Sequence, residues 1–148
     1  MKRNDQLIIS MLRADSRMSL TKMSRKTQIP VSTLYERIKS YKAGLIKKHT
    51  AIIDFSQLGF AARAKVLLKV DKDDRVGLKN HLMSSPFTNG VFKVNNGFDF
   101  IVEFIFRNMK ELEEHLDYLK ENFNLKDTKA FYIIDELKEE DFLSKCQK

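Results

Sequence analysis

The sequence is poor in the residues that build disulfide-bonded, metal-bound and membrane proteins. It has one cysteine, two prolines, five glycines and no tryptophan among 148 residues. The lone Cys146 has neither a disulfide partner nor the CxxC spacing of a zinc site, which predicts an inert thiol. No apolar run reaches the ~18–20 residues of a membrane span. The opening residues MKRNDQ lead into an amphipathic pattern unlike a signal peptide, so we expect no membrane partner and a cytoplasmic location.

Motifs for cofactors and common catalytic sites are also missing. The sequence contains no GxGxxG run, Walker loop, HExxH pair or nucleophile elbow, so it predicts no cofactor, no metal site and no catalytic residue. The three histidines, His49, His81 and His115, fall in three different predicted elements, and His115 is expected to face solvent from a helix. This distribution argues against an active site in which imidazole groups converge.

Acidic residues are scarce in only one part of the chain. Residues 1–50 contain 12 Lys and Arg against 3 Asp and Glu, whereas residues 51–148 contain 15 against 17. The positive excess therefore lies entirely in the first third. This asymmetry predicts a basic domain at 1–54, a hinge at 55–60 and a second domain at 61–148, with a polyanion as the partner of the first.

Apolar spacing in the first third predicts three short helices. The first covers about residues 4–14, and the second begins at Ser19, whose side chain can cap it. Pro30 marks a turn, and the third helix is expected to run from a cap at Ser32 to Ala43. Its buried stripe is formed by Leu34, Ile38 and Tyr41. The loosely alternating residues 45–54 predict a strand or small wing.

The third predicted helix turns hydroxyl and cationic side chains outward. Such groups contact phosphates and base edges when a helix enters the ~12 Å major groove of DNA. The pattern is therefore typical of a helix-turn-helix that binds double-stranded DNA. The candidate DNA-binding residues, including two lysines of the following segment, are Ser32, Thr33, Tyr35, Glu36, Arg37, Lys39, Lys42, Lys47 and Lys48.

The remaining two thirds alternate between strand and helix patterns. Strands are predicted at 62–70, 88–95, 98–106 and 126–137, with helices at 74–83 and from about residue 108. The second and third strands meet at Asn96-Gly97, a dipeptide favoured in two-residue hairpin turns. The order βαββαβ predicts a ferredoxin-like αβ sandwich, so that the whole chain belongs to the α+β class. Phe98, Phe100, Val102, Phe104 and Phe106 are expected to face the helices.

The opposite face of this sheet is expected to be partly apolar. Ile101, Ile105, Phe131 and Ile133 lie on it, and no predicted helix is left to cover them. An antiparallel sheet can leave one face in water, but that face is then normally polar. We therefore predict a homodimer through the sheet of residues 61–137, which would present two reading helices to a pseudopalindromic operator.

Several motifs together resemble the Lrp/AsnC, or feast/famine, family of transcriptional regulators. In the first third these are Asp5-x-x-Ile8, the run Asp15 to Ser19, the run Ser32 to Lys39 with Arg37, and Gly44-Leu45-Ile46 followed by Thr50-Ala51. In the second part they are the βαββαβ order and the hairpin Val94-Asn95-Asn96-Gly97-Phe98-Asp99-Phe100. The resemblance covers nearly the whole chain.

This resemblance implies a winged helix-turn-helix, a hinge and an αβ sandwich that dimerises and often builds tetramers or octamers. It also implies an amino-acid effector in some members, near hairpin residues Asn95, Asn96, Gly97 and Asp99. The chain departs from the family pattern where Pro30 replaces the usual serine, where the recognition helix is one residue shorter after Arg37, and where Asn96-Gly97 stands in place of Gly-Asp.

Two other functions are compatible with the same predicted fold. One is a tetrapyrrole decarboxylase of the sirohaem type, which would need convergent cationic and imidazole groups. The other is a small-molecule sensor or assembly module without DNA binding, against which the basic first third argues. DNA-binding regulation is the interpretation that uses both the charge asymmetry and the helix-turn-helix.

Overall fold

The chain folds into two compact units joined by two crossings of the backbone. The computed structural model describes residues 3–145, so Cys146 lies outside the described residues. The first unit comprises the described parts of Met1–Ile52 and Leu137–Lys148, and the second comprises Ile53–Glu136. The described residues 137–145 thus group with the basic unit, whereas the sequence predicted them to lie in a domain at 61–148.

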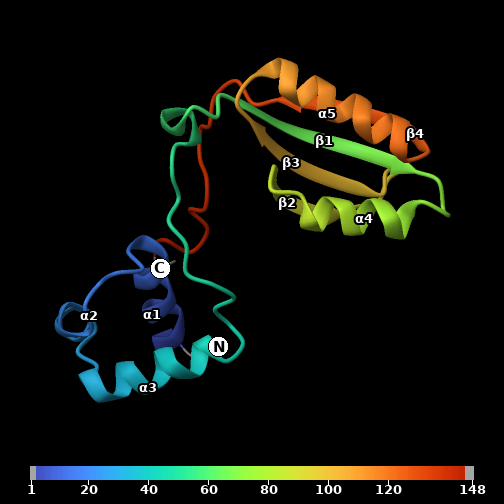
Figure 1. Ribbon diagram of the computed structural model, residues 1–148. Coiled ribbons are helices and arrows are strands. Elements are labelled where there is room, and N and C mark those ends of the chain that lie inside the picture. Colours follow the sequence, from blue (N-terminus) through green and yellow to red (C-terminus); the bar gives the residue numbers. More distant parts are fainter. Residues whose placement is uncertain (1–2, 146–148) are drawn as a thin grey trace. The chain divides into compact units, whose positions relative to one another are not determined.

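Three helices form the first unit: α1 (Arg3–Ala14), α2 (Leu20–Thr27) and α3 (Val31–Lys42) (Figure 1). Each contributes at least one side chain to a small buried core of Ile8, Met23, Leu34 and Tyr41. Apolar residues three or four positions apart lie on the same face of a helix. For this reason the spacing in the sequence predicted which side chains form this core. Ile46, beyond α3, packs against this core and donates its N–H to the carbonyl of Tyr41 at 2.8 Å.

Two local predictions for this unit are wrong. The helix α3 begins at Val31, one residue before Ser32, and its N-cap is Pro30, which has no side-chain hydrogen bond. Because Pro30 is extended at ψ 142° and its carbonyl accepts from Leu34 N–H, the first helical turn already includes Ser32. The wing strand expected within 45–54 does not form, since residues 46–54 contain no strand.

The second unit has the predicted βαββαβ order after a short 3-10 helix, η1 (Phe55–Leu58). Its elements are β1 (Ala62–Val70), α4 (Arg75–Ser84), β2 (Thr88–Lys93), β3 (Phe100–Phe106), α5 (Met109–Asn122) and β4 (Leu125–Tyr132). The strands form one sheet in the order β2-β3-β1-β4, in which every neighbouring pair is antiparallel. The architecture confirms the α+β class.

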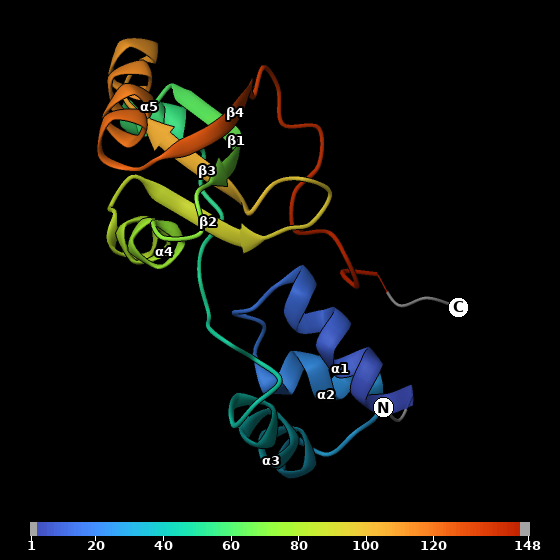
Figure 2. The ribbon, with the colours of Figure 1, turned by 90° about the vertical axis from the view of Figure 1, so that its right-hand side faces the viewer.

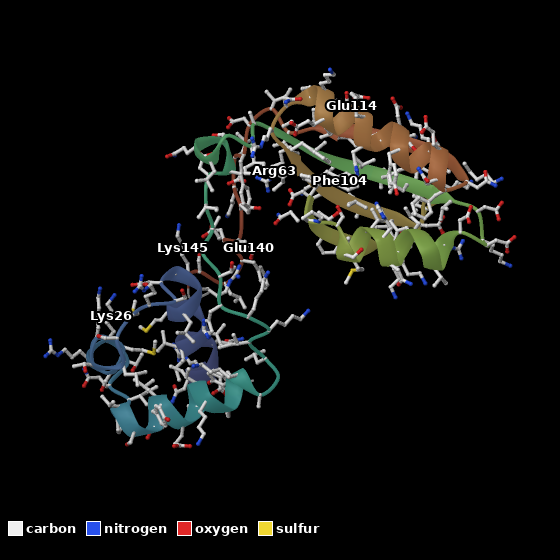
Figure 3. All side chains as sticks on the ribbon, in the orientation of Figure 1. Lys26, Arg63, Phe104, Glu114, Glu140 and Lys145 are labelled. Carbon is white, nitrogen blue, oxygen red and sulfur yellow. The ribbon has the colours of Figure 1, made fainter. Side chains whose placement is uncertain are left out.

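Both helices of this unit cover the same face of the sheet, as Figure 2 shows. Alternate residues of β1 and β3 point into the core beneath them, among them Val66, Leu68, Val102 and the fully buried Phe104 (Figure 3). Two predictions fail at the edges. Phe98 lies outside this core with Lys129 above its ring, and β4 ends at Tyr132 instead of continuing to Leu137.

No helix among residues 3–145 is long and apolar enough to cross a membrane.

Candidate nucleic-acid interface

Three local features set the two ends of α2 and the start of α3. Ser19 caps α2 by accepting the N–H of Lys22, as predicted. Gln28 ends α2 in the left-handed conformation at φ 59°, and its N–H still bonds the carbonyl of Ser24. Pro30 then supplies a backbone position without an N–H donor, so the chain changes direction before Val31 starts α3. These features produce the helix-turn-helix that the sequence predicts.

The outward face of α3 carries the predicted contact residues. All except Arg37 are exposed, and the Tyr35 side chain is 55% exposed despite being aromatic. A shallow hollow runs along the helix, and a second one lies at the turn beside Arg25 and Pro30. The first hollow is lined by Ser32, Thr33, Glu36, Arg37 and Ser40. This face therefore offers hydroxyl, carboxylate and cationic groups to one partner.

Arg37 differs from the other candidate residues because α1 holds it. Its Nη1 donates to Oδ1 of Asp5 at 2.5 Å, and the Tyr41 hydroxyl donates to the same oxygen at 2.5 Å. Hydrogen bonds with Tyr41 and Asp5 raise the pKa of Arg37, and burial, followed by the bond to Asp5, raises the pKa of Tyr41. The arginine thus stays charged and the tyrosine stays a donor.

Asp5 belongs to a motif named in the sequence analysis, which gave it no role, and the structure shows that it links α1 to α3. Its side chain is only 19% exposed, so its bonds attach α3 to α1 in a partly desolvated place. A sequence signal for it does exist: Arg37 and Tyr41 are four residues apart and share one helix face beside the buried stripe. Two polar side chains that face inward need an acceptor, and α1 supplies it.

Further basic residues follow α3 closely. Lys47 and Lys48 are exposed in the segment after α3, and His49 is exposed beside them. Because Ile46 packs against the core, the stretch that carries these cations begins at a fixed point of the first unit. On α2, Arg25 and Lys26 are exposed, and Figure 3 labels Lys26 on this helix. Exposed cationic side chains therefore occur on α2, on α3 and in the stretch that follows α3.

The candidate effector hairpin is mostly a structural turn. Asn96 and Gly97 have φ of 64° and 89°, as the hairpin prediction requires. Asn95, Asn96 and Gly97 are exposed, but Asp99 is half-buried and bonded on both oxygens. Oδ2 accepts the N–H of Val70 at 2.9 Å, and Oδ1 pairs with Nη2 of Arg75 at 2.8 Å. Asp99 therefore fastens the hairpin to the end of β1 and the start of α4.

The sheet face away from α4 and α5 combines apolar and charged groups. Cross-strand register aligns Phe92, Ile101 and Leu67 in one row across β2, β3 and β1. The Phe92 and Phe131 side chains are 63% and 56% exposed. Beside them Glu103, only 8% exposed, accepts from Nε of Arg63 at 2.8 Å and also from Asn89. This buried carboxylate is thus satisfied by two neighbours on the same sheet.

His81 and His115 meet between α4 and α5, which corrects the expectation that His115 faces solvent. Their rings are stacked with centroids 6.1 Å apart, and the rings of Phe104, Phe106 and Tyr118 surround His115. The Nε2 atoms of both histidines are buried without a hydrogen-bond partner. The pair packs with aromatic side chains, and residues 3–145 hold no cluster of three or more metal-ligating side chains.

This packing predicts a pH-dependent stability of the second unit. Burial, and secondly the charge of His81, lowers the pKa of His115 below its usual value of 6.5. Below pH 6.5, His115 therefore binds a proton more readily in the unfolded chain than in the folded unit. The free energy of unfolding then decreases as the pH falls. We expect the melting temperature of this unit to fall by a few degrees between pH 7 and pH 5.

Replacement of His115 by glutamine removes this titration and is expected to flatten the fall. Calorimetric melting at both pH values measures it, and His49→Gln, an exposed histidine of the other unit, is the control. An unchanged pH dependence in His115→Gln would contradict the assignment.

Comparison with known proteins places this helix-turn-helix in a family. No family model matches the sequence. The HTH-type transcriptional regulator FL11 of Pyrococcus horikoshii is 33% identical over 116 residues, which cover 78% of this chain and 77% of FL11. FL11 of Pyrococcus furiosus is 32% identical over 114 residues, 76% of each chain. The chain belongs to the Lrp/AsnC family of transcriptional regulators.

Solved structures agree with this regulator over nearly its full length. The Neisseria meningitidis regulator NMB0573, in complex with L-Met, superposes with a TM-score of 0.85 at 17% identity and covers 94% of this chain and 93% of its own. LrpC of Bacillus subtilis gives 0.84 at 20% identity, covering 93% and 97%. At such identities the likeness concerns the fold, and it confirms that the chain combines a helix-turn-helix with a ferredoxin-like unit, as Lrp/AsnC proteins do.

Proposed function

We propose that this DNA-binding regulator reads its operator with the outward face of α3, as a homodimer. The observation that carries the proposal is the division of α3 into two faces. Leu34 and Tyr41 on one face are buried in the core. The opposite face is polar and exposed and has a shallow hollow along it. A helix presented in this way has the shape and chemistry of a major-groove reader.

Within this face we assign different roles to different residues. Ser32 and Thr33 lie in the first turn of α3, where hydroxyl groups reach phosphates. Tyr35, Glu36 and Lys39 are exposed farther along and are proposed to meet base edges. Arg37 is proposed chiefly to position α3, because Asp5 engages its guanidinium. The exposed cations Lys42, Lys47 and Lys48 are proposed to contact the DNA backbone.

A second copy is proposed to cover the sheet face that carries Phe92, Ile101 and Phe131. This face has exposed aromatic side chains beside half-buried aliphatic ones, and such an apolar surface is more stable against another protein than in water. A two-fold dimer would set two copies of α3 on half-sites about 10–10.5 bp apart or a multiple of that spacing. The pseudopalindromic operator follows from this symmetry. Tetramers and octamers stay predictions, as does a cytoplasmic location.

An amino-acid effector is a narrower proposal. It is supported by the family and by the L-Met complex of the Neisseria regulator. The hairpin offers the exposed amides of Asn95 and Asn96 beside Gly97, whereas Asp99 already binds Val70 and Arg75. We propose no catalytic role, since the histidines that come together lie among aromatic core residues.

Salt dependence tests the DNA contacts directly. Each lysine that neutralises a phosphate releases counterions, so the logarithm of affinity falls against the logarithm of salt by about 0.9 per contact. Lys47→Ala and Lys48→Ala are each expected to weaken binding to a selected duplex and to reduce the slope by about 1 per subunit. Fluorescence anisotropy between 50 and 200 mM salt gives both quantities.

Lys79→Ala is the matched control, because Lys79 is an exposed helical lysine of the second unit. It should leave affinity and slope unchanged. If Lys47→Ala and Lys48→Ala keep the wild-type slope, these lysines do not contact the backbone of the DNA, and the proposed contact surface would have to be moved.

A further inference from the structure

The segment that follows β4, residues 133–145, returns to the DNA-binding unit, and we call it the return segment. It is mostly irregular and strongly exposed: Ile134 is 99% exposed and Leu137 is 90% exposed. Its first part belongs to the second unit and its later part to the first. The backbone therefore joins the two units a second time, in addition to the stretch that contains η1.

The return segment is held at its start by Arg63 of β1. The N–H of Ile133 donates to the carbonyl of Arg63 at 2.9 Å, and the guanidinium of Arg63 pairs with Glu136. The same guanidinium bonds Glu103 on the uncovered sheet face. One arginine thus links the return segment to the face proposed to bind a second copy.

The other anchor is Arg13, in the last turn of α1. Its guanidinium makes three hydrogen bonds to the return segment: Nη1 to Oε2 of Glu140 at 3.0 Å, Nη2 to the carbonyl of Glu140 at 2.7 Å, and Nε to the carbonyl of Phe142 at 2.9 Å. Such a fork of parallel donors fixes geometry as well as charge. Only three residues, 137–139, separate Glu136 from Glu140 in the sequence.

The docked part of the segment has a defined backbone of its own. Glu140 and Leu143 adopt φ of 50° and 60°, which non-glycine residues seldom do. Between them, hydrogen bonds from Lys138 and Ser144 lower the pKa of Asp141 to about 2, and the Ser144 N–H donates to the carbonyl of Asp141. Uncommon conformations persist where surrounding contacts hold them, and here Arg13 bonds the carbonyls inside this stretch.

Resting on the proposed function, we propose that the return segment is a strap, docked on Arg13, that limits the freedom of the DNA-binding unit and so favours simultaneous binding of two half-sites. Two connections leave a unit fewer orientations than one connection does. Restricting a binding unit before it binds lowers the entropy that must be lost when a dimer places both recognition helices on one duplex. Binding to a single half-site does not require the two DNA-binding units to be held in one relative orientation.

The test uses Arg13→Ala and Glu140→Arg in the full-length protein. Both should speed hydrogen exchange of residues 138–145 and weaken binding to a duplex with two half-sites about five- to tenfold. Binding to the same duplex with one half-site scrambled should change by less than about twofold. Arg17→Ala, an exposed arginine four residues beyond Arg13, is the control and should leave the exchange unchanged.

The two variants change charge in opposite directions, which separates the strap from simple electrostatics. Arg13→Ala removes a positive charge and Glu140→Arg adds two, so an effect through net charge alone would move DNA affinity in opposite senses. Three results would each overturn the strap. The first is a change of DNA affinity in opposite directions in the two variants, and the second is unchanged hydrogen exchange of residues 138–145 in Arg13→Ala. The third is faster exchange with unchanged affinity for the duplex with two half-sites. If the wild type binds neither duplex, the proposed DNA recognition by α3 fails, while the exchange comparison still decides whether Arg13 holds the segment.

Discussion

Replacement of Asp5 by alanine is expected to destabilise the helix-turn-helix and to abolish operator binding at working concentrations. Asp5 accepts hydrogen bonds from both Arg37 and Tyr41 of the recognition helix. A hydrogen bond to a charged group contributes about 1.5–3 kcal/mol, and its loss leaves the partners partly desolvated. Allowing for partial exposure of the pair, we expect a loss of about 2–3 kcal/mol, which is a large share of the stability of so small a unit.

The direction of the binding effect makes Asp5→Ala more informative than Arg37→Ala. Loss of Arg37 would weaken DNA binding whether the arginine contacts DNA or only positions α3. Loss of Asp5 removes a negative charge from the DNA-binding unit, so electrostatics alone would strengthen binding. Weaker binding by Asp5→Ala can therefore only come from misplacement or unfolding of the helix.

Hydrogen exchange across α3, together with anisotropy on a selected duplex, measures both effects. Asp15→Ala is the matched control, because it removes the same charge from an exposed position just after α1. It should keep wild-type exchange in α3 and bind DNA at least as tightly. Exchange in α3 of Asp5→Ala at the wild-type rate, with operator binding retained, would show that Asp5 does not position the helix.

Replacing Phe92 and Phe131 together by glutamate is expected to convert the proposed dimer into a monomer. Both side chains are more than half exposed in the single chain, so the substitutions should leave the fold intact. In a covered interface each lost aromatic costs about 1.5–3 kcal/mol, and the new carboxylates must be desolvated as well. Because a two-fold dimer loses both aromatics from each chain, at least about 6 kcal/mol in all corresponds to a loss of about ten-thousandfold or more in dimer affinity.

Sedimentation at micromolar concentration measures the oligomer, and anisotropy on the two-half-site duplex measures the consequence. Val76→Glu is the control: Val76 is 68% exposed on α4, so it has similar exposure but lies on a helix that covers the other sheet face. It should remain dimeric. A Phe92→Glu, Phe131→Glu protein that sediments as the wild type would remove the sheet face as the dimer interface.

Patterns with a short period were predictable because local geometry produces them. Alternation in β1, helical spacing in α4 and α5, and the Asn96-Gly97 turn follow from backbone periodicity and from positive φ. The same reasoning fails at element ends. The sequence predicted a strand as far as Leu137, yet Ile134 and Leu137 are almost wholly exposed beyond the end of β4. A period cannot indicate where a partner strand stops.

The sequence by itself determined a basic helix-turn-helix followed by a βαββαβ unit, because periodicity, turn residues and charge balance are local quantities. The tertiary structure alone decided that Asp5 engages Arg37, 32 residues away, that His81 stacks on His115, and that Arg13 binds Glu140, 127 residues away. A polar side chain can form hydrogen bonds with many different partners, and an aromatic one can pack against many. Only the packing of distant segments, which brings one donor to one acceptor, selects among them.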